Sequence, residues 1–256
     1  MTFLDDIGGF NPWVLAMLLN TGLGLLGWKL VSKLLTPSGL AHAWILGVIV
    51  WAVLGWPGYG VVLFYFLAGS AVTKVGMAQK EAAGIAEKRS GARGPENVWG
   101  SAASSTLCAL TTLVVPLEYH PLLYLGYVSG FSTKLSDTTA SEIGKAYGNR
   151  TFLITTLRPV PRGTEGAVSL EGTLAGMLAS VVIAVLAWAV GLIPAVGIGW
   201  CALAALIATN LESLIGATVQ SQFVWLTNEV VNGINTLIGS LSAMGIAIIW
   251  ARLIVG

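Results

Sequence analysis

The segment STKLSDTTASEIGKAYGNR, Ser132–Arg150, lies between strongly apolar stretches of the chain. Five of its residues are charged: Lys134, Asp137, Glu142, Lys145 and Arg150. Small and hydroxyl-bearing residues separate these charges. A solvated loop would account for the charges but less readily for the small residues between them. The segment is therefore the first place to look for a functional site.

The composition around this segment is that of a membrane protein. The chain has 256 residues, of which 55% are hydrophobic and only 10% are charged, whereas a soluble domain has about 25% charged residues. We interpret residues 1–256 as a single integral membrane domain. A net charge of +1 does not suggest a nucleic-acid partner. Cys108 and Cys201 lie in apolar runs, which favours packed thiols over a disulfide or a metal site.

Apolar stretches of the length that a spanning helix needs, roughly 17–25 residues, recur along the chain. The candidates are 12–31, 40–56, 59–73, 98–116, 119–134, 171–193, 195–211 and 234–252. Three tight turns are expected between neighbouring spans, at WPGYG (56–60), LEYHP (117–121) and GLIPAVG (191–197). The predicted fold is all-α: a polytopic integral membrane helix bundle of about eight transmembrane helices with glycine-rich cytoplasmic loops.

The basic residues predict the orientation. Every Lys and Arg except Arg252 falls on one side of this arrangement, and cytoplasmic loops carry the excess of positive charge. Loops 74–97, 134–170 and 212–233 should therefore be cytoplasmic. These three loops also hold the unusual polar residues.

If the segment Ser132–Arg150 is helical, its small and polar residues form one stripe along the helix. Asp137, Ala140, Ser141, Gly144 and Gly148 share a helix face, so a backbone or a ligand can approach closely beside one carboxylate. Two carboxylates at a membrane surface, Asp137 and Glu142, suit Mg²⁺, which takes oxygen ligands from one or two protein carboxylates and from substrate phosphates. The alternative is a helix end with solvated acids, in which Glu142 pairs with Lys145.

The next polar segment, VPRGTEGAVSLEGTLAG (160–176), is rich in glycine and leads into a predicted span. Free N–H groups and the helix dipole at such a position favour a phosphate. The pattern is not a P-loop, because no Gly-Lys-Ser/Thr follows the turn. The alternative is glycine used for helix packing.

Two further loops supply candidates. Lys74, Lys80 and Arg93 could bind phosphate with Asn97 as a polar helper, or the loop could anchor on anionic lipid; Lys88 and Arg89 are expected to be plain surface charges. Glu212 ends an apolar run and is a candidate metal ligand or base. Three asparagines then share the helix face entering the last span, either facing a cavity or bonding between helices: Asn228, Asn232 and Asn235.

Acidic, basic and glycine-rich loops on one face of a membrane protein suit the transfer of a phosphate-bearing group onto a lipid. A soluble donor would stay in water while the lipid tail stays in hydrocarbon. Two other classes remain open: a membrane transporter, and a CTP-dependent lipid nucleotidyltransferase, which would release pyrophosphate.

Taken in order, the motifs LTPSGLAHAWILG, TKVGMAQK, GARGPENVWGSA, KLSDTTASEIGKAYG, VPRGTEGAVSLEGTLAG, LESLIGATVQ and NEVVNGIN resemble the phytyl-phosphate kinase family of plants and cyanobacteria. The transmembrane protein 19 group looks similar, and the CTP-dependent polyprenol and phytol kinases are distantly similar. The resemblance implies a kinase that converts phytyl phosphate, an isoprenoid monophosphate, into the diphosphate for tocopherol and phylloquinone synthesis. It also implies Mg²⁺ and a nucleoside triphosphate, with CTP favoured. The expected location is a bacterial or cyanobacterial inner or thylakoid membrane, or a plastid envelope.

The resemblance places Asp137 and Glu142 in its acidic core, Thr164 in its second loop, Glu212 in the third and Asn232 in the last; Lys134 and Glu165 occupy more variable positions. The complete site hypothesis has three groups. The catalytic residues are Asp137, Glu142, Lys74, Lys80 and Arg93. The substrate- and phosphate-binding residues are Ser136, Ser141, Lys145, Arg162, Gly163, Thr164, Ser169, Gly172, Asn97, Asn228 and Asn232. The metal ligands are Asp137, Glu142 and Glu212.

Overall fold

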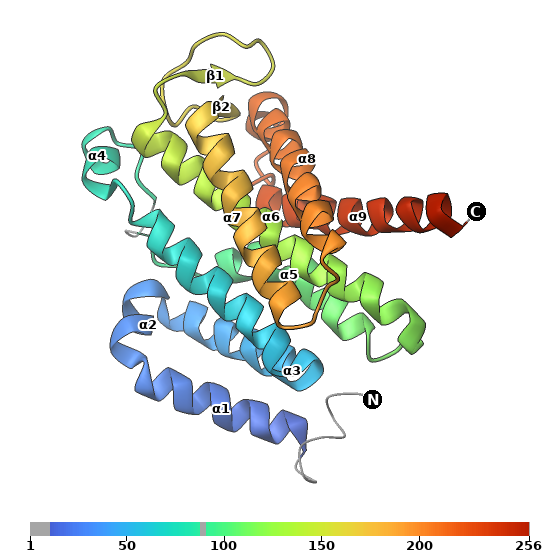
Figure 1. Cartoon of the computed structure of the whole chain (residues 1–256). Helices are drawn as coiled ribbons and strands as arrows, with labels where there is room; N and C mark the ends of the chain where they lie inside the picture. The colour runs from blue at the N-terminus through green and yellow to red at the C-terminus, as the bar shows by residue number, and fades with distance from the viewer. Residues whose placement is uncertain (1–10, 88–90, 256) are drawn as a thin grey trace.

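The computed structural model describes residues 11–87 and 91–255, so Lys88 and Arg89 lie outside the described residues. Helices account for most of this part of the chain (Figure 1). The elements are α1 (Pro12–Leu26), α2 (Trp28–Leu34), α3 (Pro37–Thr73), α4 (Met77–Ala82), α5 (Pro95–Thr111), η3 (Leu117–Tyr119), α6 (His120–Tyr147), β1 (Thr151–Leu153), β2 (Ala167–Ser169), α7 (Leu170–Ala189), α8 (Val196–Thr218), η4 (Gln220–Gln222) and α9 (Asn228–Val255). The predicted all-α fold is confirmed, with a small antiparallel hairpin of β1 and β2 added at one end.

Helix α3 consists of two helices joined at a sharp break. Gly55 has φ 64° and ψ −159°, a conformation that glycine adopts without the strain of a side chain, and Pro57 follows it. A straight helix of 37 residues would be about 55 Å long, whereas each half is close to the 30 Å of a bilayer core. The turn expected at 56–60 is therefore present, one residue earlier than predicted.

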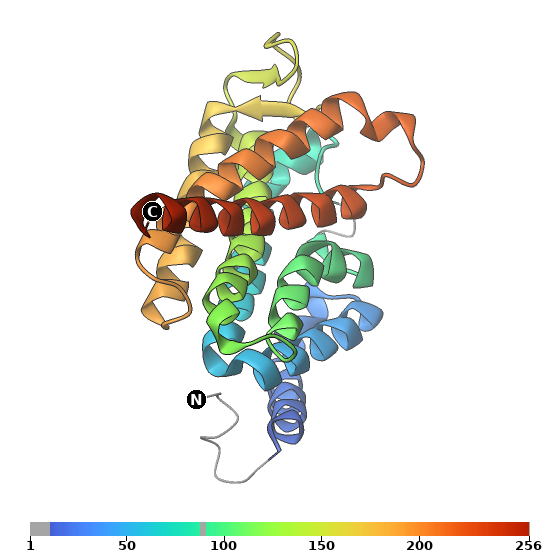
Figure 2. The same cartoon turned by 90° about the vertical axis from the view of Figure 1, so that its right-hand side faces the viewer.

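Helix α6 is the centre of the bundle. It contacts α3, α5, α7, α8 and α9, which surround it in both views (Figures 1 and 2). Its apolar side chains Tyr127, Phe131 and Leu135 are buried in the main core. The hydroxyl of Tyr127 donates a hydrogen bond to the Gly58 carbonyl at 2.7 Å, next to the break in α3.

Small residues let α6 and α7 pack closely. A Cβ atom at Gly172 would lie 2.5 Å from the Ala140 carbonyl oxygen, and one at Gly176 would lie 2.7 Å from that of Ser136. Contacts this short leave no room for a side chain. The small-residue stripe of the opening segment therefore accommodates a neighbouring helix, as small residues do at membrane helix interfaces.

Among the residues that the structure describes, four helices are long and apolar enough to span a membrane: α3, α7, α8 with η4, and α9. The bent pair α1–α2, with 88° between its helices, makes a fifth if it counts as one span. The predicted spans in α5 and α6 do not belong to this group, because α5 has only 17 residues and the second half of α6 is polar. Both α5 and α6 pack against other helices of the bundle. The predicted number of eight membrane spans therefore stays a prediction.

The polar segments are more helical than expected. The predicted loop 134–170 is wrong in its first part, because α6 continues to Tyr147. Likewise α8 runs on to Thr218 and α9 begins at Asn228, which shortens the predicted loop 212–233. Polar side chains in these helix ends form hydrogen bonds to other helices, as Lys134 does to Asn232. The drop in hydropathy along the sequence therefore did not coincide with the ends of the helices. The turn expected at 191–197 separates α7 from α8.

The close contact between α6 and α7 gives a stability prediction. Gly176→Ala should lower the free energy of unfolding by about 1–3 kcal/mol, since overpacking forces backbone shifts. Gly245→Ala in α9, where a Cβ would meet nothing within 4 Å, should be neutral or stabilise by up to about 1 kcal/mol. Thermal unfolding in detergent measures both, and equal melting temperatures for the two variants would contradict the packing argument.

Candidate active site

A cavity of about 840 Å³ lies at the end of the bundle where α5 and α9 begin, α8 ends, and the hairpin joins α6 to α7. It contains every predicted site residue except Lys74 and Lys80: Arg93, Asn97, Ser136, Asp137, Ser141, Glu142, Lys145, Arg162, Gly163, Thr164, Ser169, Gly172, Glu212, Asn228 and Asn232. Segments far apart in the sequence thus come together at one place. Whether these residues carry the predicted roles stays a prediction.

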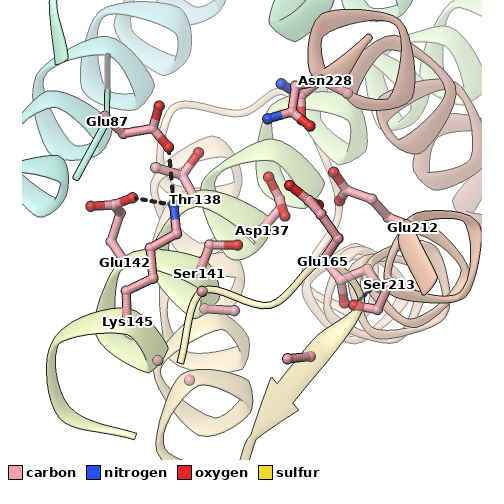
Figure 3. A pocket seen from close by; sticks show the side chains of 18 of the residues that line it. Glu87, Asp137, Thr138, Ser141, Glu142, Lys145, Glu165, Glu212, Ser213 and Asn228 are labelled. Carbon is pink, nitrogen blue, oxygen red and sulfur yellow. Dashed lines mark hydrogen bonds and ion pairs between the residues drawn. The ribbon is translucent and has the colours of Figure 1, made fainter. Parts of the chain in front are cut away.

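Two carboxylates from different helices meet in this cavity. Asp137 of α6 and Glu212 of α8 lie close enough to share a hydrogen bond, in which one of the two acids carries the proton. Glu165, from the loop before β2, points toward both of them (Figure 3). Glu165 was not among the predicted site residues. Its position between Gly163 and Gly166, which both have positive φ, shows that a tight glycine loop delivers it.

Lys134 ties this acidic group to α9. Its ammonium donates to Asp137 Oδ2 at 2.5 Å and to Asn232 Oδ1 at 2.8 Å. Asn235 of α9 donates a hydrogen bond to Glu212. The asparagine face of α9 therefore does form interhelical hydrogen bonds, and it does so at the wall of the cavity.

The electrostatics favour an ionised Asp137. Burial raises its pKa, but the Lys134 ammonium and the hydrogen bonds it receives lower it more, so that the pKa of Asp137 lies below its usual value. One ammonium group then faces three acidic side chains, because Glu165 and Glu212 lie beside the ionised Asp137, and Glu212 carries the proton of its hydrogen bond to Asp137. This oxygen-rich, negatively charged spot has the donor chemistry that Mg²⁺ prefers.

Glu142 belongs to a different group of charges. It is buried and accepts a hydrogen bond from the fully buried Lys80, whose ammonium also donates to the Thr73 carbonyl at 2.7 Å. Its other oxygen lies 3.4 Å from Lys145 Nζ, which lies 3.2 Å from a Glu87 oxygen (Figure 3). The alternative pairing of Glu142 with Lys145 is therefore present.

This arrangement corrects the predicted metal set. Within residues 11–87 and 91–255, no three Asp, Glu, His or Cys side chains are close enough to form a metal site by themselves. The set of Asp137, Glu142 and Glu212 is not assembled, because both oxygens of Glu142 are engaged by lysines. Nor does Lys80 reach the cavity, while Lys74 is exposed outside it. Lys80 is the counterion of the buried Glu142 and does not line the cavity, so its ammonium is not placed to contact a phosphate there.

Burial and charge act on Lys145 in opposite directions. Burial lowers its pKa, whereas Glu87 and Glu142 raise it more, and the pKa of Lys145 is raised overall. The side chain is thus held as an ammonium at the cavity wall. Glu87, like Glu165, was missed, because nothing in its local sequence indicates a contact with α6.

Arg93 is fixed by both its backbone and its side chain. Its N–H donates to the Leu34 carbonyl at 2.9 Å, and its carbonyl accepts from Thr36 N at 3.0 Å. Its guanidinium lies 5.3 Å from the ring centre of Tyr65 and 5.8 Å from that of Phe66. Aromatic rings hold the cation without neutralising it, which leaves its charge available to an anion in the cavity.

The glycine-rich segment serves structure as well as the cavity. Arg162 donates a hydrogen bond to the Ala146 carbonyl at 3.0 Å and so caps the end of α6. Gly163 has φ 82° in the turn that Thr164 closes on the Pro161 carbonyl. Ser169 caps α7 by accepting from Gly172 N at 3.1 Å. Gly172 therefore serves helix packing, the alternative considered for this glycine-rich segment, and it also borders the cavity.

Residues 20–240 match the model of a family of integral membrane proteins, DUF92. The chain belongs to this family. An uncharacterized membrane protein of Synechocystis is 65% identical over 92% of this chain and 91% of its own. The chloroplastic protein VTE6 of Arabidopsis thaliana is 48% identical over 91% of this chain and 71% of its own. An uncharacterized membrane protein of Methanocaldococcus jannaschii is 32% identical over 82% of this chain and 84% of its own.

These relatives agree with the plant and cyanobacterial family resemblance drawn from the motifs. The DUF92 match begins in α1 and ends in α9, so it includes every helix that lines the cavity. No solved structure matches the chain.

The buried ion pair gives the next prediction. Lys80→Met should lower the free energy of unfolding by about 3–5 kcal/mol, because it leaves Glu142 as a buried charge without its main partner. Lys74→Met, six residues earlier and exposed, should change it by no more than about 0.5 kcal/mol. Denaturant unfolding in detergent compares the two.

The double variant Lys80→Met with Glu142→Met should recover part of the loss, since it removes the uncompensated charge as well. A double variant less stable than Lys80→Met alone would contradict the structural role of this pair.

Proposed function

We propose that this DUF92 protein is a membrane lipid kinase. It phosphorylates an isoprenoid monophosphate, phytyl phosphate, to the diphosphate with a nucleoside triphosphate, for which CTP is the favoured donor. This activity would supply precursor for tocopherol and phylloquinone. The motif resemblance suggests the substrate, and the kinship with VTE6 supports it.

One observation supports this function above the others: a large cavity in which carboxylates, cations and hydroxyls from many separate segments of the chain converge, among helices apolar enough to span a membrane. Two phosphorylated substrates, one soluble and one lipid, need such a place. The cavity is polar where the phosphates would meet, and it borders apolar helices where a lipid tail would lie.

The reaction joins an oxygen of the acceptor phosphate to the terminal phosphorus of the donor. The bond from that phosphorus to the bridging oxygen breaks, and the nucleoside diphosphate leaves. The attacking oxygen is already ionised, so no strong general base is required. Catalysis of this kind consists mainly of positioning and of charge stabilisation.

The cations of the cavity divide this work. Arg93, held on its aromatic rings, and Lys145, held by Glu87 and Glu142, are placed to bind donor phosphates. Lys134 keeps Asp137 ionised and fixes its orientation beside Glu212. Asn97, Ser141 and Thr164 offer neutral hydrogen bonds around them.

Asp137 and Glu212 are the residues that would hold Mg²⁺, and Glu142 is not, since lysines occupy it. When bound, the ion would neutralise charge on the donor phosphates. Two protein carboxylates suffice for Mg²⁺ when phosphates and water complete its shell, so the pair fits the ion although no three-residue site exists among the described residues.

The activity prediction is a product assay. Purified protein in detergent, given Mg²⁺, phytyl phosphate and CTP, ATP, GTP or UTP in turn, should form phytyl diphosphate and the matching nucleoside diphosphate, detected by mass spectrometry. A CDP-linked lipid with pyrophosphate would identify a nucleotidyltransferase instead. If folded protein forms no product with any donor, the kinase proposal fails and transport in liposomes becomes the next assay.

The acidic pair gives a second activity prediction. Asp137→Asn and Glu212→Gln should each lower kcat by about 100-fold or more, as removal of one preorganised charge does in other enzymes. The matched control is Glu118→Gln, an exposed carboxylate before α6 at its opposite end, which should keep the wild-type rate. Variants of the pair that fold and retain normal kcat would contradict their role.

A further inference from the structure

The cavity has an apolar side. Most of its residues are polar or small, but Met177 of α7 and Leu206 of α8 also line it. Helices α7 and α8 are joined at residues 190–195 and spread apart toward the cavity in Figure 2. Met177 and Leu206 therefore line the cavity from two diverging helices, and the part of the cavity between them is called the opening.

The floor of this opening is α6. Ser136, Asp137 and Ala140 of α6 line the same cavity, and α6 packs against both α7 and α8. A molecule lying between the two helices would thus reach the acidic pair at one end. Going outward from the pair, it would pass Met177 and Leu206.

The outer faces of both helices are apolar and exposed. Leu174 and Leu178 of α7 are 57% and 65% exposed, and Leu203 and Ile207 of α8 are 47% and 38% exposed. Both helices have the length and apolarity of membrane spans. In a bilayer these faces contact lipid, so hydrocarbon lies directly outside the two helices that line this part of the cavity.

Helix α8 lines the cavity with polar residues, Thr209 and Asn210, as well as with the apolar Leu206. The side-chain amide of Asn210 donates to the Leu206 carbonyl of its own helix at 2.7 Å, so this exposed polar group satisfies itself without water. Thr209 likewise donates to the Ala205 carbonyl at 2.9 Å. Each of these two polar side chains therefore uses one donor within α8.

We propose that the opening between α7 and α8 is the portal for the isoprenoid chain of the acceptor, and that Met177 and Leu206 select for it. This inference rests on the proposed kinase function. With its phosphate in the polar part of the cavity, beside the Lys134 ammonium, the acceptor extends its tail over Met177 and Leu206 into the membrane. The donor enters from the other side, past Arg93 and Lys145.

The test compares two acceptors that share a phosphate and differ in tail length: phytyl phosphate and the five-carbon isopentenyl phosphate. Met177→Trp narrows the opening and should raise the KM for phytyl phosphate about tenfold, the scale on which a hydrophobic pocket discriminates, with little change in kcat. Turnover of isopentenyl phosphate should stay as in the wild type, because that molecule does not reach the opening. Leu206→Trp should behave in the same way.

The matched control is Leu178→Trp, the next residue on α7, which is 65% exposed and does not line the cavity. It should leave both KM values unchanged. If Met177→Trp impairs both acceptors equally, or neither, the portal lies elsewhere and the proposal is overturned.

A second measurement does not depend on turnover. Phytyl phosphate with a photoreactive diazirine midway along its chain should crosslink to α7 and α8 without nucleotide, and less so in Met177→Trp. Crosslinking there in a protein that makes no diphosphate would keep the portal and reject the kinase. Diphosphate synthesis with crosslinks confined to other helices would keep the kinase and reject the portal.

Discussion

The ammonium of Lys134 is the group on which the architecture of the cavity depends. It is buried between α6 and α9, bonded to Asp137 on its own helix and to Asn232 on the other. A charge inside a membrane protein is costly unless it is paired. The pairing therefore fixes how α6, α8 and α9 meet, because Asp137 is in turn joined to Glu212 and Glu212 to Asn235.

Close helix packing makes this network possible. Gly239 of α9 lies against Thr133, and Gly130 of α6 lies against the hydroxyl of Ser105 on α5; a Cβ atom at either glycine would meet these neighbours at 2.0 and 2.3 Å. Hydroxyl groups along the same seam bond to main-chain carbonyls, as Ser129 does to Gly239 and Ser240 does to Gly126, both at 2.9 Å. The seam places α9 against α6 at the distance that Lys134 needs to reach Asn232.

The sequence predicted the helices and turns better than the contacts between them. The apolar runs identified the membrane character and the turns around Gly55 and residues 191–197, since burial in lipid leaves a direct mark on composition. The stripe from Asp137 to Gly144 was correctly assigned to one helix face, whereas Gly148 lies just beyond the end of α6 in an extended conformation. The neighbour of this stripe was not foreseeable, because close packing against Gly172 and Gly176 depends on a helix that begins 22 residues beyond Gly148.

Charge pairing was the least predictable feature. Glu142 and Asp137 look equivalent in the sequence, yet one is engaged by Lys80 and Lys145 and the other faces Glu212. The deciding contact, from Lys80 to Glu142, crosses 62 residues, and no local pattern encodes it. Glu165 was likewise not predicted, because its position in the cavity depends on where its loop lies rather than on the residues beside it.

The depth of the acidic pair links this geometry to a membrane substrate. Asp137 lies ten residues before the end of α6, and Glu212 lies six before the end of α8. At 1.5 Å per residue, these are about 15 Å and 9 Å from the helix ends. Both acidic side chains thus lie within the bundle rather than at the helix ends. Under the proposed function, a lipid phosphate would reach such a depth without pulling its tail out of hydrocarbon, while a soluble donor would extend its phosphates inward past Arg93 and Lys145. A deep cavity would thus let one site serve two substrates that prefer different solvents.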